Sequence, residues 1–252
     1  MPTLPPSKLL QLPVLALDTA TEQLVAGLHT GNRAYTCQGA GGVAASARLL
    51  PELSALLARA TLGWRDLGAI AFGQGPGAFT GLRTACAVAQ GLGFGLGCRL
   101  LPLDSLMIVA EDARAQIQNG DADLSIGVLM DARMDEVYAA SYRWQEGRWQ
   151  VLQAPALFSL PSLHEAWSDA TLQALAGTAL QAFGPRLHLP CCGPRLPQQQ
   201  DRAAALLRLA VRGVADGVGV DPAQALPLYL RDKVAQTTAE REQIKAAAAL
   251  AP

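Results

Sequence analysis

Two aspartates that end apolar runs are the residues best placed to do chemistry in this sequence. Asp18 closes the run VLALD and Asp131 closes the run IGVLMD, and each is followed by a short polar turn and an alternating, strand-like stretch. A carboxylate at such a position can act as an acid, but Asp also stabilises turns by bonding its own backbone. We interpret both as turn residues, and the repeat of the pattern suggests a duplicated lobe.

A glycine-rich turn, GQGPGAFTGLR at residues 73–83, is the second candidate, because such turns can bind nucleotide phosphates. It contains no lysine, which excludes a Walker loop. The dinucleotide fingerprint fits better, since residues 73–78 match it after an apolar strand and Asp104 ends the next strand. Against this interpretation, Pro76 lacks a backbone N–H, and the helix is expected to begin at Thr80, beyond the fingerprint.

A structural interpretation accounts for more of the same residues. Glycines such as Gly75 and Gly77 permit backbone conformations that other residues avoid, and Thr80 is expected to cap the following helix. Small residues then recur at every fourth position and form a ridge that lets another helix approach closely: Gly77, Gly81, Ala85, Ala89, Gly93 and Gly97. Because glycine costs roughly 1 kcal/mol relative to alanine inside a helix, the ridge predicts close packing.

The elements that carry these residues alternate between strands and helices, which predicts an α/β fold. We expect a β-hairpin at residues 12–35, a strand–helix–strand unit at 67–104 and an amphipathic helix at 202–218. A leucine-rich helix at residues 46–60 places an apolar stripe on one side, which includes Leu49, Leu53 and Leu56. The stretch from 147 to 200 gives a weaker pattern.

Composition favours a folded protein of the cytoplasm. The chain has 252 residues, half of them hydrophobic, and a formal net charge of -1. No apolar run reaches the roughly 18 residues that a membrane-spanning helix needs, and the first 13 residues lack the features of a signal peptide. Without a general excess of positive charge, nucleic acid is expected to be bound only through a partner or a local patch.

The spacing of the cysteines and histidines gives little support for a metal site or a catalytic nucleophile. The chain has five cysteines without a CxxC spacing, which we interpret as reduced thiols, and its three histidines do not fall at the spacing of a metal-binding helix. No nucleophile and base can be paired from the sequence, which disfavours a peptidase. We therefore expect no metal, no cofactor and no catalytic residue.

Four segments together identify a resemblance to a known family. VLALDTATEQLVAGL, AIAFGQGPGAFTGLRTACAVAQGLGFGL, VLMDARMDEVYAASY and PLYLRDKVA occur in the order and spacing of the TsaB (YeaZ) family of tRNA threonylcarbamoyladenosine biosynthesis. The resemblance covers most of residues 14–235, and it is loose from about 145 to 220. Its specific motifs are GQGPGAFTGLR and DARMDEVY.

The resemblance implies an actin-like fold with two duplicated lobes, as in Hsp70 and sugar kinases. It divides the chain into an N-terminal tail at 1–13, a first lobe at 14–107, a second lobe at 108–222 and a C-terminal segment at 223–252 that returns toward the first lobe. As structural motif residues we name Asp18, Gly75, Pro76, Gly77, Thr80, Arg83, Asp131, Tyr229 and Arg231.

The resemblance also implies a function. Family members act with the catalytic subunit TsaD and the ATPase TsaE to transfer a threonylcarbamoyl group from its adenylate to N6 of the adenosine beside the tRNA anticodon. TsaD carries its metal on an HxxxH pair, which the corresponding helix around residues 44–48 lacks. We expect a noncatalytic subunit that pairs with TsaD and contacts tRNA indirectly; the isolated chain is expected to be either a monomer or a homodimer. The expected partner interface consists of Leu49, Leu53, Leu56, Gly81, Ala85, Ala89 and Gly93.

An independent enzyme is the alternative hypothesis. A kinase-like ATPase or another nucleotide-binding enzyme would use the glycine turn at residues 73–81 directly. Whether the isolated chain binds a nucleotide separates the two hypotheses.

Overall fold

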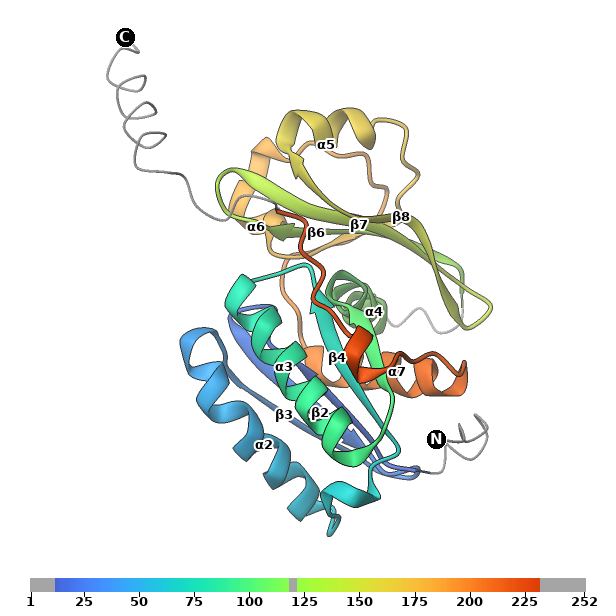
Figure 1. Cartoon of the computed structure of the whole chain (residues 1–252). Coiled ribbons are helices and arrows are strands. Elements are labelled where there is room, and N and C mark those ends of the chain that lie inside the picture. The colour runs from blue at the N-terminus through green and yellow to red at the C-terminus, as the bar shows by residue number, and fades with distance from the viewer. Residues whose placement is uncertain (1–11, 118–121, 232–252) are drawn as a thin grey trace, which may run out of the picture.

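The computed structural model describes residues 12–117 and 122–231, which form two five-stranded sheets (Figure 1). The first sheet has the order β3-β2-β1-β4-β5. Its β1, β2 and β3 are antiparallel neighbours, whereas β4 and β5 add in parallel on the other side of β1. The strands are β1 (Val14–Asp18), β2 (Gln23–His29), β3 (Ala34–Ala40), β4 (Ala69–Gly75) and β5 (Leu100–Asp104).

The second sheet repeats this arrangement. Its order is β10-β9-β6-β7-β8, with β6, β7 and β8 antiparallel and β9 and β10 added in parallel beside β6. The strands are β6 (Leu124–Asp131), β7 (Glu136–Gln145), β8 (Arg148–Ser159), β9 (Ala174–Ala176) and β10 (Arg195–Leu196). The same strand order in both sheets confirms the duplicated, actin-like fold.

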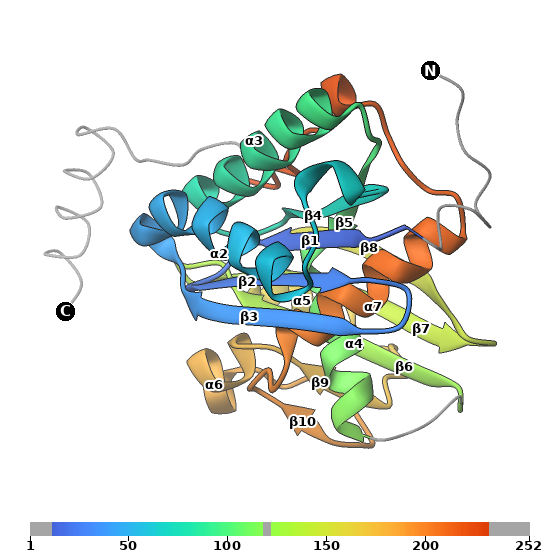
Figure 2. The same ribbon diagram turned by 90° about the horizontal axis from the view of Figure 1, so that it is seen from below.

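Helices cover both faces of the first sheet, as Figure 2 shows. On one face lie α2 (Ala45–Arg59) and α3 (Phe79–Leu96), and on the other, between the two sheets, lie α4 (Ser105–Ile117) and α7 (Arg202–Ala215). The second sheet carries α5 (Leu160–Ala166) and α6 (Ala179–Phe183). Short 3-10 turns complete the chain: η1 (Gly42–Ala44), η2 (Trp64–Asp66), η3 (Gly184–Arg186) and η4 (Pro222–Gln224).

Alternation along β1 explains how this layering arises. Successive side chains of a strand point to opposite faces, so Leu15 and Leu17 pack with α2 and α3, whereas Val14 and Ala16 pack with α7. All four side chains are buried. A strand that is apolar at every position therefore has a helix on each face.

The sequence expectations for these elements are largely confirmed. The β1–β2 hairpin, the β4–α3–β5 unit and α7 lie within residues 12–35, 67–104 and 202–218, as predicted. The division of the chain into two lobes stays a prediction. Helix α7 lies within the range assigned to the second lobe, but it packs on the first sheet. The expected N-terminal tail at 1–13 lies mostly outside the described residues. In the part of the chain that the structure describes, no helix is long and apolar enough to cross a membrane.

Candidate functional site

The carboxylate of Asp18 lies at the end of β1 and is fully buried. Its Oδ1 accepts a hydrogen bond from the backbone N–H of Ala20 at 3.0 Å, the turn contact expected of an Asp. Its Oδ2 accepts two from the guanidinium of Arg202, from Nε at 2.9 Å and Nη2 at 2.5 Å, and both side chains are almost without solvent exposure. The Asp18 carboxylate is therefore committed to a buried ion pair.

Arg202 is a residue that the sequence analysis missed. It is the first residue of α7 and also donates to the side-chain oxygen of Gln199 at 2.7 Å and to the carbonyl of Ser105 at 3.3 Å. One guanidinium thus connects the end of β1 with the beginnings of α4 and α7. The only signal in the sequence was an arginine that directly precedes the apolar run AAALL and directly follows Asp201, which caps α7.

The glycine turn packs against the Asp18 turn. A Cβ on Gly73 would lie 2.1 Å from Oδ1 of Asp18, and a Cβ on Gly77 would lie 2.4 Å from the carbonyl oxygen of Ala20. Gly75 has a φ of 117°, a conformation that favours glycine. Farther on, Gly81 approaches the backbone of Thr19, whose hydroxyl donates to the Gly81 carbonyl at 2.6 Å. These glycines therefore allow two turns of one lobe to touch.

The beginning of α3 differs from the expectation. The N-cap residue is Ala78 and makes no side-chain capping bond, and the helix begins at Phe79. Thr80 thus lies inside the first turn, where its carbonyl accepts from the Thr84 hydroxyl at 3.0 Å. The predicted cap at Thr80 is wrong, because the close approach of the Asp18 turn sets where the helix starts.

The small-residue ridge of α3 faces the interior. Gly81, Ala85, Ala89 and Gly93 are buried, as are Leu49, Leu53 and Leu56 of α2. Ala85 and Ala89 pack in the same core cluster as the three leucines. A Cβ on Gly93 would come within 2.9 Å of Leu100 and Pro222. The ridge is therefore internal packing, which corrects the partner-interface prediction for these seven residues.

A second row of α3, two positions along from the ridge, is exposed. It contains the small residues Ala87, Gly91 and Gly95, together with Phe94, whose exposed fraction is 62%. A Cβ on Gly91 or Gly95 would meet no atom within 4 Å. Packing among residues 12–117 and 122–231 thus gives no reason for glycine at these two positions. Both rows of small residues can be recognised in the sequence, but the sequence alone does not show which row faces the sheet.

The second aspartate turn has a different environment. Asp131 ends β6 as Asp18 ends β1, but its side chain is 25% exposed and accepts a backbone N–H from Arg133 at 2.8 Å. After Ala132, residues 133–135 have positive φ values of 64°, 56° and 63°. Arg186 holds this left-handed turn by donating to both carboxylate oxygens of Asp135, at 2.9 and 2.5 Å. The Arg186 side chain lowers the pKa of Asp135 below its usual value of 3.8 through these hydrogen bonds.

A C-terminal segment, residues 226–231, connects the two lobes, and we call it the strap (Figure 1, at the red end of the colour bar). In the first lobe the Leu228 N–H donates to the Gln74 carbonyl at 2.7 Å. In the second lobe Arg231 donates to the Ala132 carbonyl at 2.9 Å and forms an ion pair with Glu136 at 2.5 Å. The strap thus fixes the left-handed turn relative to the first lobe.

A cleft of about 720 Å³ lies between the lobes. The Asp18 and Asp131 turns, the beginning of α3 and the strap all contribute to its wall. Its arginines are paired: Arg202 with Asp18, Arg231 with Glu136, and Arg133 with Glu22 and Asp131. The cleft walls therefore carry nearly balanced charge.

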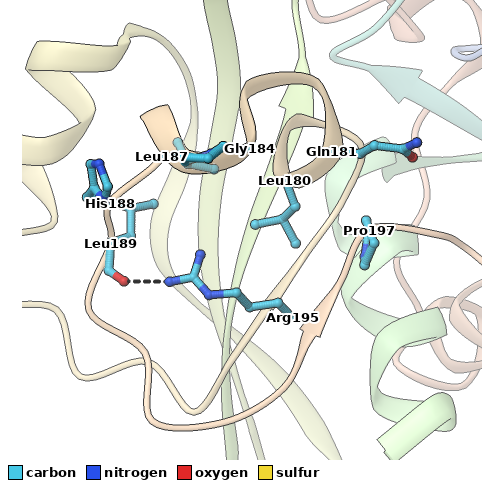
Figure 3. Close-up of a pocket in the computed structure, with 9 residues that line it drawn as sticks. Leu180, Gln181, Gly184, Leu187, His188, Leu189, Arg195 and Pro197 are labelled. Atoms are coloured by element: carbon cyan, nitrogen blue, oxygen red, sulfur yellow. Dashed lines mark hydrogen bonds between the residues drawn. The ribbon is translucent and has the colours of Figure 1, made fainter.

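A second hollow, of about 780 Å³, lies on the second lobe beside α6 and β10 (Figure 3). Leu180, Leu187 and Leu189 give it an apolar lining, and the Arg195 guanidinium donates to the Leu189 carbonyl at 2.9 Å. Its arginine thus supports the loop beside it. Among residues 12–117 and 122–231, no group of three His, Cys, Asp or Glu side chains is placed to hold a metal ion.

Comparison with known proteins places this arrangement in a family. A family model described as "TsaD: tRNA N6-adenosine threonylcarbamoyltransferase" matches residues 41–192. The tRNA threonylcarbamoyladenosine biosynthesis proteins TsaB of Escherichia coli (strain K12) and Haemophilus influenzae are 31% and 38% identical to this chain. The alignments cover 88% of this chain and 96% and 95% of the two relatives.

A solved structure agrees with the sequence relatives. YeaZ from Pseudomonas aeruginosa superposes with a TM-score of 0.74 at 36% sequence identity, covering 87% of this chain and 100% of that one. The matched model and the near full-length relatives together show that the chain belongs to the TsaB (YeaZ) family.

Proposed function

We propose that this chain is a noncatalytic subunit required for threonylcarbamoyl transfer to N6 of the adenosine adjacent to the tRNA anticodon. A TsaD-like subunit performs the transfer from threonylcarbamoyl-adenylate, and a TsaE-like ATPase acts with the two. The observation that carries the proposal is the near full-length similarity to proteins named for tRNA threonylcarbamoyladenosine biosynthesis. The burial of Asp18 against Arg202 supports a structural rather than a chemical role for that carboxylate.

We assign the TsaD-like partner to the outer side of α3 and α2. Glycine lowers helix stability by roughly 1 kcal/mol relative to alanine, and Gly91 and Gly95 occupy exposed positions where no contact with the described part of the chain requires a glycine. Small residues on a helix surface allow the backbone of a partner helix to approach closely. Leu50 of α2 and Phe94 of α3, exposed by 45% and 62%, supply apolar side chains on these two helices.

Three further properties belong to the proposal. Without its partner, the outer side of α3 is expected to pair with a second copy of the chain. Contact with tRNA is indirect, through the TsaD-like subunit, because the chain carries a net charge of -1. The complex acts in the cytoplasm.

Depletion of the protein from its native host tests the function. Nucleoside mass spectrometry should show the loss of threonylcarbamoyladenosine from tRNAs that carry it. Re-expression of the wild-type chain should restore the nucleoside, which controls for indirect effects. Unchanged levels after full depletion would contradict the proposal.

The alternative of an independent nucleotide enzyme is tested with the purified chain. We expect no ATP hydrolysis and only weak ATP binding by calorimetry. A dissociation constant in the low micromolar range, equivalent to about -8 kcal/mol, would favour the alternative.

A further inference from the structure

Arg83 is an exposed cation whose guanidinium is held in place by two aromatic rings. It lies at the beginning of the second turn of α3, at the start of the exposed row. Its Cζ lies 3.8 Å from the centroid of the Phe79 ring, and its Nε donates to the Tyr229 hydroxyl at 3.1 Å. The rings of Phe79 and Tyr229 are themselves in contact, with centroids 4.9 Å apart.

The strap restricts the position of Tyr229 and therefore stabilises the cluster of Arg83, Phe79 and Tyr229. Tyr229 lies between Leu228, whose N–H is bonded to Gln74, and Leu230, which precedes the largely buried Arg231. Both neighbours thus restrict where the tyrosine can lie. A guanidinium supported in this way loses less conformational entropy on binding than a free arginine side chain does.

The donors of Arg83 that remain are those on Nη1 and Nη2. Among the described residues Arg83 forms no ion pair, whereas Arg48 of α2 pairs with Glu52 at 3.0 Å. Arg59, at the end of α2, is also engaged, because it lies over the Tyr35 ring and donates to the Thr36 carbonyl. Of these three arginines on the α2–α3 layer, Arg83 is the one with a free bidentate edge.

We propose that Arg83 is the electrostatic anchor of the partner-facing surface and binds an aspartate or glutamate carboxylate on a helix of the partner protein. This inference rests on the proposed function, because the partner is the TsaD-like subunit. A planar guanidinium matches a carboxylate through two parallel hydrogen bonds. The rest of the row is small or apolar, which suits a helix, whereas a nucleic-acid backbone needs several cations.

Charge reversal tests the anchor. Arg83→Glu should raise the dissociation constant for the purified TsaD-like subunit by about tenfold or more in calorimetry. Arg83→Lys should bind with an intermediate affinity, because lysine lacks the planar fork. Arg83→Gln should bind more weakly than wild type and lose part of the dependence of affinity on salt concentration. The matched control is Arg33→Glu, a reversal of an exposed arginine on the β2–β3 turn, which should bind like wild type.

Three outcomes distinguish the carboxylate proposal from a phosphate contact and from a failure of the proposed partnership. If Arg83→Glu binds as tightly as wild type while a bulky residue at Gly91 blocks binding, the anchor is overturned and the proposed interface stands. If Arg83→Glu leaves the subunit complex intact but weakens its binding of tRNA, the residue contacts phosphate and the carboxylate proposal is wrong. If the wild-type chain itself does not bind the TsaD-like subunit, the proposed partnership fails. Thermal unfolding of each variant confirms that it is folded before binding is compared.

Discussion

At the scale of single residues, the ion pair of Asp18 and Arg202 joins parts of the chain that are 184 residues apart. Removing two charges from water is costly, and the cost is offset only when the pair is well aligned and its other polar atoms are bonded. Both conditions hold here, because Asp18 also bonds Ala20 and Arg202 also bonds Gln199. Losing one member alone leaves a buried charge without its partner.

We therefore expect Asp18→Asn and Arg202→Met to lower the free energy of unfolding by about 3–5 kcal/mol each. The double variant should lose less than the sum of the two, because neither charge is then stranded. Urea denaturation of the four proteins measures the coupling. Additive losses would show that the two side chains act independently.

Glu111 of α4 gives the clearest dependence on pH. Burial by itself raises the pKa of this carboxyl, but hydrogen bonds from Arg114, Arg208 and Trp149 outweigh it and lower the pKa below 4.5. A lowered pKa in the folded state contributes stability that is fully present above 4.5 and is lost as the pH falls through the folded-state value.

Glu111→Gln should lower the free energy of unfolding at neutral pH by about 3 kcal/mol, since it leaves buried donors facing a neutral amide. The difference from wild type should stay constant between pH 6 and 7 and shrink below about pH 4.5. Urea denaturation at several pH values measures this. A difference that does not change with pH would contradict the assigned role of the charge.

At the scale of elements, α3 presents two rows of small residues with opposite environments. The inner row, which includes Ala89, packs in the core, whereas the outer row, which includes Ala87, is exposed. The two alanines are two positions apart on one helix, so they have nearly the same intrinsic helical context. Substituting each of them by the same residue therefore separates an effect on folding stability from an effect on association with the partner.

Ala89→Leu should lower the free energy of unfolding by about 1–3 kcal/mol through overpacking of the core. Ala87→Leu should change it by less than about 0.5 kcal/mol, since the side chain is exposed. Copurification with the TsaD-like subunit should be lost for Ala87→Leu and retained by the folded fraction of Ala89→Leu. The reverse result would return the interface to the inner row.

The comparison of the two rows shows how far the sequence could predict this molecule. Apolar periodicity and glycine placement predicted β1, β2, β4 to β7, α2, α3, α7 and the duplication, because these depend on local spacing, whereas β3, β8 to β10 and α4 to α6 were not predicted. Which row of α3 is buried depends on the approach of the Asp18 turn to Gly81, a contact between distant segments. The partner of Asp18, Arg202, is likewise defined only when α7 returns to the first sheet.

At the scale of the whole molecule, the strap holds a strained turn. Positive φ values at non-glycine residues cost about 1–3 kcal/mol each, and residues 133–135 form three in succession. Arg231 offsets part of this cost by bonding the carbonyls of Ala132 and Arg133 and pairing with Glu136. The conformation of the turn therefore depends on a residue that lies 99 positions after Ala132 in the chain.

Arg231→Ala should release the turn and raise the rate of tryptic cleavage after Arg133 by about tenfold, because proteolysis follows the population of open states. Cleavage after Arg33, on an exposed turn of the first lobe, is the internal control and should not change. Mass spectrometry of the fragments over time measures both. Equal rates for the variant and wild type at Arg133 would show that the turn is stable without the strap.

The late position of α7 in the chain has a consequence for biosynthesis. The ribosome releases the N-terminal strands first, yet the side of β1 that carries Val14 and Ala16 is covered by residues 202–215. Until those residues emerge, the nascent first lobe presents an apolar sheet face to water and to other chains. The first lobe therefore completes its folding only after the second has been translated, which makes the interval between them the period when chaperones are most needed.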